Sequence, residues 1–298
     1  MRIGRHMPTN SKPVKAAEMA HQIGCDAMQI FASNPTGWRP PLAGSKQYAA
    51  FAQAIQTYDL DPVVLHAPYL INLGTLDETI WEKSIALLTW TMQRAALLGA
   101  RYVVCHTGSH RGAGVEAGIA RVAQGVARVL QEAPTSVMLL LENDVGAGHS
   151  LGYSFAHLAA ILNQVPQYQQ SSLGICLDTA HLWGAGHDIS TAASARQVLD
   201  DVQASIGLAH LQVLHLNETE KALGSHRDVH ARLGEGVIGD DGLRAILTDP
   251  RLAHVTVLME TPIKRDAQEK EDWLHDATQI AKARQLAETS IPAPPGHP

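Results

Sequence analysis

The sequence predicts a single (β/α)8 TIM barrel, and two observations lead to that prediction. Eight short runs rich in leucine or β-branched residues recur along the 298 residues, and alanine-rich stretches with helical periodicity separate most of them. The length and the 45% hydrophobic fraction are enough for one large core, and no shift in composition within residues 1–285 marks a domain boundary. An open doubly wound sheet is the alternative arrangement of the same elements.

The expected strands are mostly about 35–45 residues apart, which is the repeat length of an α/β barrel. They cover residues 2–6, 26–32, 62–67, 101–107, 137–143, 173–179, 211–217 and 255–261. Amphipathic periodicity predicts helices over residues 12–24, 48–58, 79–98, 117–132, 154–165 and 193–206. Asp61-Pro62 leads into the third strand, Gly99 ends a helix, and Pro134 precedes the fifth strand. The proline-rich tail over residues 286–298 is expected to be disordered.

Charge and cysteine content limit the class of protein. The formal net charge of −6 gives no general attraction for polyanions, so nucleic acid would need a local basic or metallic surface. Three cysteines cannot form a disulfide framework, no apolar run reaches the roughly 18 residues of a membrane helix, and the first residues do not resemble a signal peptide. We therefore expect a cytoplasmic monomer with no membrane partner. The composition also includes 16 histidines, and histidine is the commonest metal ligand.

Metal-binding side chains stand at the ends of six of the eight expected strands. They are His66, His106, Glu142, Asp178, His215 and Glu260. The carboxyl ends of barrel strands form one ring at the mouth, so these side chains are expected to converge there. Further donors lie nearby: His181 would lie one turn after Asp178 if a helix starts there, and Asp228 and His230 share one side of an extended segment.

Nine donors are too many for one zinc ion, which usually takes four ligands, and they suit two or three metal ions that share carboxylate bridges. A single histidine or glutamate at a strand end is more often a hydrogen-bonded structural residue. Six at equivalent strand ends favour the metal interpretation. Without cations, such a buried ring would carry a large desolvation penalty and strongly shifted pKa values.

Longer motifs then resemble, in order and spacing, those of the endonuclease IV family of apurinic/apyrimidinic endonucleases. They are HAPYLINLG (66–74), HTGSH (106–110), LENDVGAG (141–148), LDTAHLWGAGHD (177–188), HLNETEKALGSHRDVHARLGEGVIG (215–239) and METP (259–262). The resemblance runs from about residue 3 to about residue 285. It implies a zinc-dependent TIM-barrel enzyme of base excision repair. Such an enzyme hydrolyses the phosphodiester on the 5′ side of an abasic site in double-stranded DNA and leaves a 3′-hydroxyl.

The resemblance also implies three zinc ions and assigns the nine donors to them. His66 and His106 would hold the first ion, and Glu142 would bridge it to the second. Asp178, His215 and Glu260 would complete the second site, and His181, Asp228 and His230 would hold the third. The nucleophile would be a hydroxide that bridges two zinc ions, so that Glu142 acts as a bridging ligand and no side chain attacks phosphorus.

The match is weaker at the expected DNA contacts. Asn34, Trp38, Tyr69 and Asn72 match residues that approach DNA in the family and are the DNA-binding candidates. Elsewhere the chain departs from the pattern: Thr36 and Gly37 stand where the family has side chains that enter the base stack, commonly Arg and often Gln, Glu220 where it usually has Lys, and Val229 where it has Arg. Two positive charges are thus lost or moved at a surface that should meet phosphates.

Two strand cysteines are expected to pack in the interior and not to act as nucleophiles. Alternation along the strand points Cys105 away from the mouth when His106 points into it. Free cysteine, here Cys105 and Cys176, behaves as a small apolar side chain.

Two other functions remain open on the sequence alone. A sugar isomerase or epimerase of the xylose-isomerase-like type needs only Glu142, Asp178, His215 and Glu260, for one or two metal ions. It has no need of the five additional donors, which favours the nuclease. The other is a DNA-binding relative that has lost lesion recognition through the four departures, and the complete ligand set argues against lost catalysis.

Overall fold

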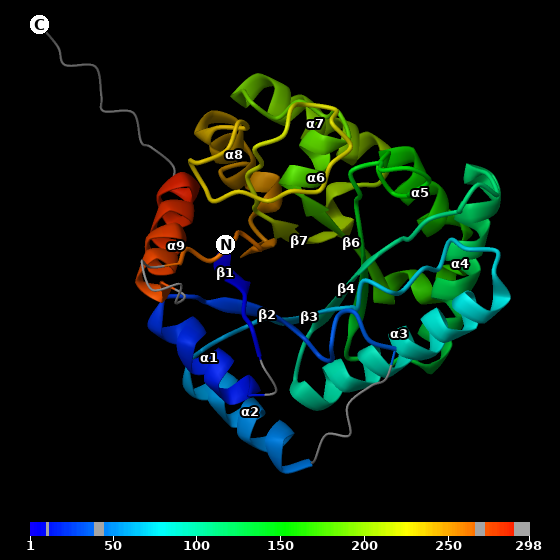
Figure 1. Ribbon diagram of the computed structural model, residues 1–298, viewed down its shortest axis with the longest axis horizontal. Helices are drawn as coiled ribbons and strands as arrows, with labels where there is room; N and C mark the ends of the chain where they lie inside the picture. The colour runs from blue at the N-terminus through cyan, green and yellow to red at the C-terminus, as the bar shows by residue number, and fades with distance from the viewer. Residues whose placement is uncertain (10–11, 39–44, 266–271, 289–298) are drawn as a thin grey trace, which may run out of the picture.

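The computed structural model describes residues 1–9, 12–38, 45–265 and 272–288, and these form a closed barrel (Figure 1). Each strand pairs in parallel with the next, and β8 pairs with β1 to close the sheet. The strands are β1 (Arg2–His6), β2 (Ala27–Phe31), β3 (Val63–His66), β4 (Tyr102–His106), β5 (Met138–Glu142), β6 (Leu173–Asp178), β7 (Leu211–His215) and β8 (Thr256–Met259). The predicted (β/α)8 fold is therefore confirmed, and the open sheet is excluded.

Helices surround this barrel (Figure 1). The described α-helices are α1 (Pro13–Gln22), α2 (Ser45–Thr57), α3 (Glu78–Leu98), α4 (Val115–Glu132), α5 (Phe155–Gln164), α6 (Thr179–Gly184), α7 (Ala192–Ser205), α8 (Asp240–Leu247) and α9 (Trp273–Ala287). Short 3-10 turns are η1 (Gln167–Ser172), η2 (Leu208–His210) and η3 (Pro250–Leu252). The six helices predicted from periodicity are confirmed, whereas α6, α8 and α9 were missed. The tail was predicted to begin at residue 286, but residues 286 and 287 belong to α9. Residues 289–298 lie outside the described residues.

Local sequence explains where the helices begin and end. The Asp77 carboxylate accepts a hydrogen bond from the backbone N–H of Ile80 and caps α3, and Gly99 ends that helix with a φ of 71°. Thr191 and Ser194 form a reciprocal capping box at the start of α7. These caps satisfy N–H groups that the first turn of a helix leaves without partners, and glycine tolerates the left-handed conformation at its end.

Two apolar layers hold the barrel. Inside it, one residue from each of seven strands forms a buried plug: Ala27, Val64, Val104, Leu140, Cys176, Val213 and Leu258. A larger cluster fills the space between the sheet and the helices, and Cys105 belongs to it. Both strand cysteines are buried, and Cys105 lies on the outer side of the sheet, as alternation predicted. The plug closes the middle of the barrel, so any ligand must bind at its ends.

Among the described residues, no helix has both the length and the apolar character to cross a bilayer.

Candidate metal centre

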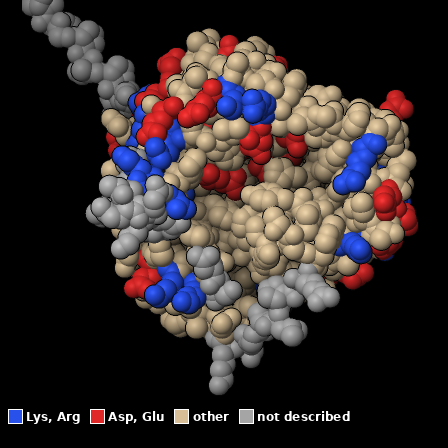
Figure 2. Space-filling view, viewed as in Figure 1, with Lys and Arg blue, Asp and Glu red and all other residues tan. Residues whose placement is uncertain are grey.

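The nine predicted donors come together at the carboxyl end of the barrel. His66, His106, Glu142, Asp178 and His215 are the last residues of five consecutive strands, and Glu260 follows β8 directly. Figure 2 shows Asp and Glu side chains inside a hollow on this face, with Lys and Arg side chains at several places around its edge. The strand-end pattern in the sequence therefore becomes one acidic site in space.

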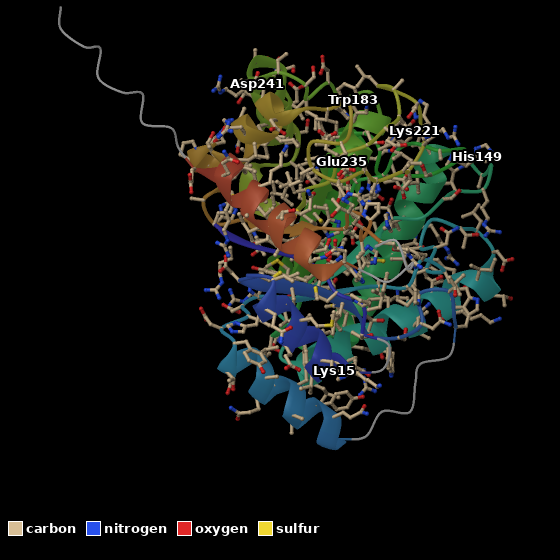
Figure 3. All side chains as sticks on the ribbon, turned by 60° about the vertical axis from the view of Figure 1, so that its left-hand side comes forward. Lys15, His149, Trp183, Lys221, Glu235 and Asp241 are labelled. Carbon is tan, nitrogen blue, oxygen red and sulfur yellow. The ribbon has the colours of Figure 1, made fainter. Side chains whose placement is uncertain are left out.

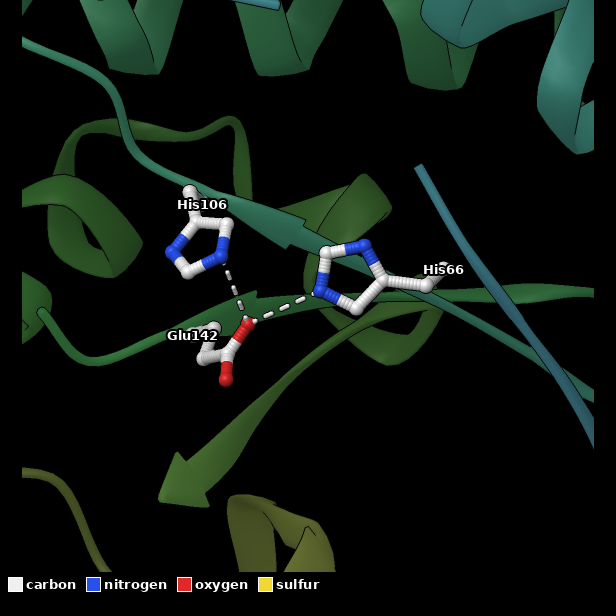
Figure 4. Close-up of side chains that lie close together, drawn as sticks. All are labelled: His66, His106 and Glu142. Atoms are coloured by element: carbon white, nitrogen blue, oxygen red, sulfur yellow. Dashed lines mark hydrogen bonds and ion pairs between the residues drawn. The ribbon is translucent and has the colours of Figure 1, made fainter. Parts of the chain in front are cut away.

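The first group of donors is His66, His106 and Glu142 (Figure 4). One carboxylate oxygen of Glu142, Oε2, lies 3.2 Å from Nε2 of His66 and 3.4 Å from Nε2 of His106. His66 and Glu142 are almost fully buried, whereas 23% of the His106 side chain is exposed. Two imidazole nitrogens and one carboxylate oxygen thus face a common point.

Glu142 also belongs to the second group, together with Asp178, His215 and Glu260. Its other oxygen, Oε1, lies 2.8 Å from Nδ1 of His215. That same nitrogen is 3.5 Å from Oε2 of Glu260 and 3.9 Å from Oδ2 of Asp178. Because the two oxygens of Glu142 face different groups, its carboxylate has the geometry of a bridging ligand.

The third group lies where α6 and the loop after β7 meet the barrel. The Asp178 carboxylate caps α6 by accepting a hydrogen bond from the backbone N–H of His181 at 2.9 Å, which fixes His181 one turn beyond the strand. Asp228 Oδ1 lies 3.4 Å from Nε2 of His181 and 3.3 Å from Nε2 of His230. Asp178 Oδ2 is 3.6 Å from the same nitrogen of His230. Asp178 therefore stands between the second and third groups.

Buried polar partners hold the donors in these orientations. Asn217 donates from Nδ2 to Oδ2 of Asp178 and accepts from the backbone N–H of Glu260 at 2.8 Å. The Asn143 side-chain oxygen accepts from the backbone N–H of Asp178 at 2.6 Å. Neither asparagine was predicted from the sequence, although Asn143 directly follows the strand-end donor Glu142 and Asn217 lies two positions after His215.

The loop after β7, residues 216–239, carries two of the donors and is itself well anchored. Glu218 is fully buried, and its carboxylate accepts hydrogen bonds from the backbone N–H groups of Ile238 at 3.0 Å and Gly239 at 2.8 Å. Trp183 of α6 donates from its indole nitrogen to the carbonyl oxygen of Lys221 at 2.8 Å, and Figure 3 shows the two residues at neighbouring positions. This loop can thus hold Asp228 and His230 at fixed positions.

The acidic side chains change the protonation of the site. Burial opposes charge on His230, yet Asp178 and Asp228 raise its pKa to about 9. Burial also disfavours the ionised form of Glu142, but His106 and His215 hold the pKa of that carboxyl well below its usual range. Burial also tends to lower the pKa of His181, but Asp178 and Asp228 raise it well above the ordinary value. The carboxylates of the site therefore favour positive charge at His181 and His230, and the histidines favour negative charge at Glu142.

The donor set fits zinc, because it consists of imidazole nitrogens and carboxylate oxygens, which zinc accepts as ligands besides thiolate. The facing atoms lie within 4.8 Å of one another in the first group, in the second group, and among Asp178, His181 and His230 of the third. Asp228 joins the third group through its contacts with His181 and His230. Cys176 forms a further possible metal-binding group with Glu142 and His215. Burial raises the pKa of its thiol to about 12, so it is a neutral thiol near pH 7.

The four DNA-binding candidates line two hollows beside the centre. Asn34 and Tyr69 line a cavity of about 940 Å³ that also contains His230 and Glu260. Trp38, Tyr69 and Asn72 line a groove of about 590 Å³ that reaches His106. Lys83 and Arg111 line the same groove. Lys83 was missed because a lone lysine on a helix carries no signal in the sequence.

Two of these candidates already use their side-chain oxygens within the fold. Asn34 Oδ1 accepts from the backbone N–H of Thr36 at 3.1 Å and so shapes a turn. Asn72 Oδ1 accepts from the backbone N–H groups of Gly74 at 3.1 Å and Ser109 at 2.9 Å, joining the loops after β3 and β4. Tyr69 is 57% exposed and packs its ring 5.5 Å from that of His66. Tyr69 is thus the candidate most available to a ligand.

Known proteins resemble this chain in sequence and in fold. Residues 17–283 match the family described as xylose isomerase-like TIM barrel. The chain is 41% identical to a probable endonuclease 4 of Natranaerobius thermophilus over 88% of this chain and 92% of that protein. The crystal structure of endonuclease IV from Thermus thermophilus is 36% identical, covers 96% of this chain and 98% of that one, and superposes with a TM-score of 0.82. A D-psicose 3-epimerase from Clostridium cellulolyticum, 17% identical over 97% of this chain and 100% of that one, with a TM-score of 0.73, shares the fold.

Proposed function

Because this chain belongs to the endonuclease IV family of xylose isomerase-like TIM barrels, we propose that it is a zinc-dependent hydrolase of DNA phosphodiesters at abasic sites. Its substrate would be double-stranded DNA that contains such a site, and it would act in base excision repair. The observation that carries the proposal is the convergence of all nine donors in three groups joined by two carboxylates, Glu142 and Asp178.

Each group of donors would hold one zinc ion. The first ion would be held by His66, His106 and Glu142, and the second by Glu142, Asp178, His215 and Glu260. The third would be held by His181, His230 and Asp228. When bound, the ions would supply positive charge to the phosphodiester and lower the pKa of a water molecule so that it attacks phosphorus near neutral pH. Since one chain provides every donor, the centre needs no second subunit and is compatible with the expected monomer.

The protein's own groups would orient the substrate. Partial burial, together with the nearby carboxylates of Glu260 and Glu142, raises the pKa of Tyr69, so its hydroxyl stays protonated and can donate a hydrogen bond to a phosphate oxygen. Lys83 and Arg111 line the adjoining groove, where they can neutralise neighbouring phosphates. Neither strand cysteine competes as a nucleophile, because burial raises the pKa of Cys105 as it does that of Cys176.

The departures at the recognition surface affect affinity more than chemistry. Thr36 and Gly37 are part of the turn shaped by Asn34, and Glu220 lies exposed in the loop after β7. None of the three is among the nine donors. We therefore propose that catalysis is intact and that DNA is held through contacts different from those of relatives with longer or basic side chains at these positions.

The test is incision of a duplex with one abasic-site analogue by the zinc-loaded protein, with metal content measured on the same sample. We expect about three zinc ions per chain and a single cut on the 5′ side of the lesion. His230→Ala should lower kcat about 100-fold or more while changing DNA affinity less, because a cation acts mainly on the transition state.

His254→Ala is the matched control, since His254 Nε2 bonds the Leu211 carbonyl oxygen at the opposite end of the barrel. It should leave incision unchanged. One zinc per chain, or three zinc ions with no incision, would exclude the proposal. Conversion of a keto sugar in place of incision would favour the epimerase alternative.

A further inference from the structure

We propose that Gln29, which is not one of the nine donors, is a positioning residue that sets the ring orientation of His215 and the direction of the Glu260 carboxylate. The inference rests on the proposed metal centre and extends it to β2, a strand that contributes none of those donors. Gln29 is fully buried and points into the barrel mouth from the middle of β2.

Gln29 joins three strands through its amide group. Its Nε2 lies 3.0 Å from Nδ1 of His6 on β1 and 2.5 Å from Oε1 of Glu260. Its Oε1 lies 2.9 Å from Nε2 of His215 on β7. The amide therefore has partners for both hydrogens of its nitrogen and for its oxygen.

These partners leave one orientation for the amide. An ionised carboxylate only accepts hydrogen bonds, so the amide nitrogen must face Glu260 and the amide oxygen must face His215. The oxygen can bond His215 only if Nε2 of that ring carries a hydrogen. The other ring nitrogen, Nδ1, is then the one with a free lone pair in the neutral ring, and it is the nitrogen that faces Glu142 at 2.8 Å.

His215 differs in this respect from other histidines of the centre. His66, His181 and His230 bond backbone carbonyl oxygens through Nδ1, at 2.7, 2.9 and 3.4 Å, and turn Nε2 toward the donor groups. In His215 the two nitrogens exchange roles: Nδ1 faces the donor group, and Nε2 bonds the side chain of Gln29. A single substitution of Gln29 can therefore remove the contact that orients this ring, whereas a backbone carbonyl cannot be removed by substitution.

Gln29 also sets the direction of the Glu260 carboxylate. The two carboxylate oxygens of Glu260 have different neighbours: Oε1 accepts a hydrogen bond from Gln29, and Oε2 lies 3.5 Å from Nδ1 of His215, toward the second donor group. Removal of the amide would leave Oε1 with the His6 ring at 3.6 Å as its neighbour. The carboxylate would then be free to rotate away from the second group.

Two substitutions separate the two contacts. Gln29→Met keeps the length of the side chain and removes the bonds to His215 and Glu260, together with the contact to His6. Gln29→Glu keeps an acceptor for His215 but cannot donate to Glu260 and adds a negative charge beside it. Gln169→Met is the matched control, because Gln169 is also a buried glutamine, 5% exposed, and donates to the Ala127 carbonyl oxygen outside the mouth.

The decisive measurement is zinc affinity and stoichiometry by competition with a chromophoric chelator, together with the visible spectrum of the cobalt-substituted protein. We expect Gln29→Met to weaken one of the zinc sites by about 10–100-fold and to alter the cobalt spectrum. Gln29→Glu should recover the wild-type cobalt spectrum in part, because His215 keeps its acceptor. Gln169→Met should match the wild type in both readouts.

Wild-type zinc affinity and an unchanged cobalt spectrum in Gln29→Met would overturn the inference, as would an equal loss in Gln169→Met. These readouts do not use DNA, so they are separate from the test of function. A wild-type protein that binds zinc without cutting abasic DNA would exclude the nuclease and leave the role of Gln29 standing.

Discussion

His230 illustrates how single residues connect the acidic site to stability. Its pKa is raised to about 9 by carboxylates that outweigh burial, against an unfolded value near 6.5. A raised pKa in the folded state stabilises it below the unfolded pKa, and this stabilisation disappears as the pH rises through the folded pKa. Zinc acts in the opposite direction, because it binds the deprotonated ring.

We therefore predict that the zinc-free protein loses stability between pH 6.5 and about 9, by about 3 kcal/mol at most from His230. The zinc-loaded protein should not lose stability over this range. Thermal unfolding midpoints measured across it, with chelator or with zinc, test the prediction. A zinc-free midpoint that stays constant from pH 6.5 to 9 would contradict it, and His230→Gln should reduce the slope.

The sequence predicted the nine donors because strand ends and side-chain alternation are visible in it. It did not predict Gln29, Asn143 and Asn217, because amides occur throughout any sequence and their role depends on partners far away in the chain. Gln29 bonds residues 186 and 231 positions away. Such contacts exist only once the barrel is closed, so periodicity cannot reveal them.

At the scale of elements, α9 is held by a buried ion pair. Arg5 of β1 pairs with Asp276 of α9, and both side chains are 3% exposed or less. Arg5 also donates to the Thr261 carbonyl oxygen just beyond β8 at 2.9 Å. The pair thus ties the last helix to the two strands that close the barrel. Periodicity predicted neither α8 nor α9: α8 is only eight residues long, and charged side chains interrupt the apolar pattern of α9.

We predict that Asp276→Ala lowers the free energy of unfolding by about 3–5 kcal/mol, because it removes the buried carboxylate that pairs with the buried Arg5 charge. The double variant Arg5→Met with Asp276→Leu should be less destabilised than Asp276→Ala alone, since it buries no charge. Urea unfolding of the zinc-loaded proteins measures both. Arg128→Ala removes an exposed ion pair with Glu82 and should change the free energy of unfolding little. An effect as large as that of Asp276→Ala would contradict the view that burial makes the Arg5–Asp276 pair costly to break.

For the whole molecule, the net charge of −6 gives a misleading view of its affinity for DNA. Four of the acidic residues are donors of the metal centre, and three bound divalent cations would offset the formal charge completely. Figure 2 shows the remaining pattern, with carboxylates inside the hollow and cations at places around it. Affinity for a polyanion should therefore depend on where a charge lies and not on the total.

Glu220 allows this to be tested, because it is exposed in the loop after β7 at the mouth. Glu220→Lys should raise affinity for abasic duplex DNA and increase the slope of log affinity against log salt by about 0.9, the value for one additional phosphate contact. Glu132→Lys makes the same change in net charge at the C-terminal end of α4, which points to the opposite end of the barrel. It should leave the slope nearly unchanged. Equal slopes for the two variants would mean that total charge governs binding, and an unchanged slope in Glu220→Lys would mean that this loop does not meet a phosphate.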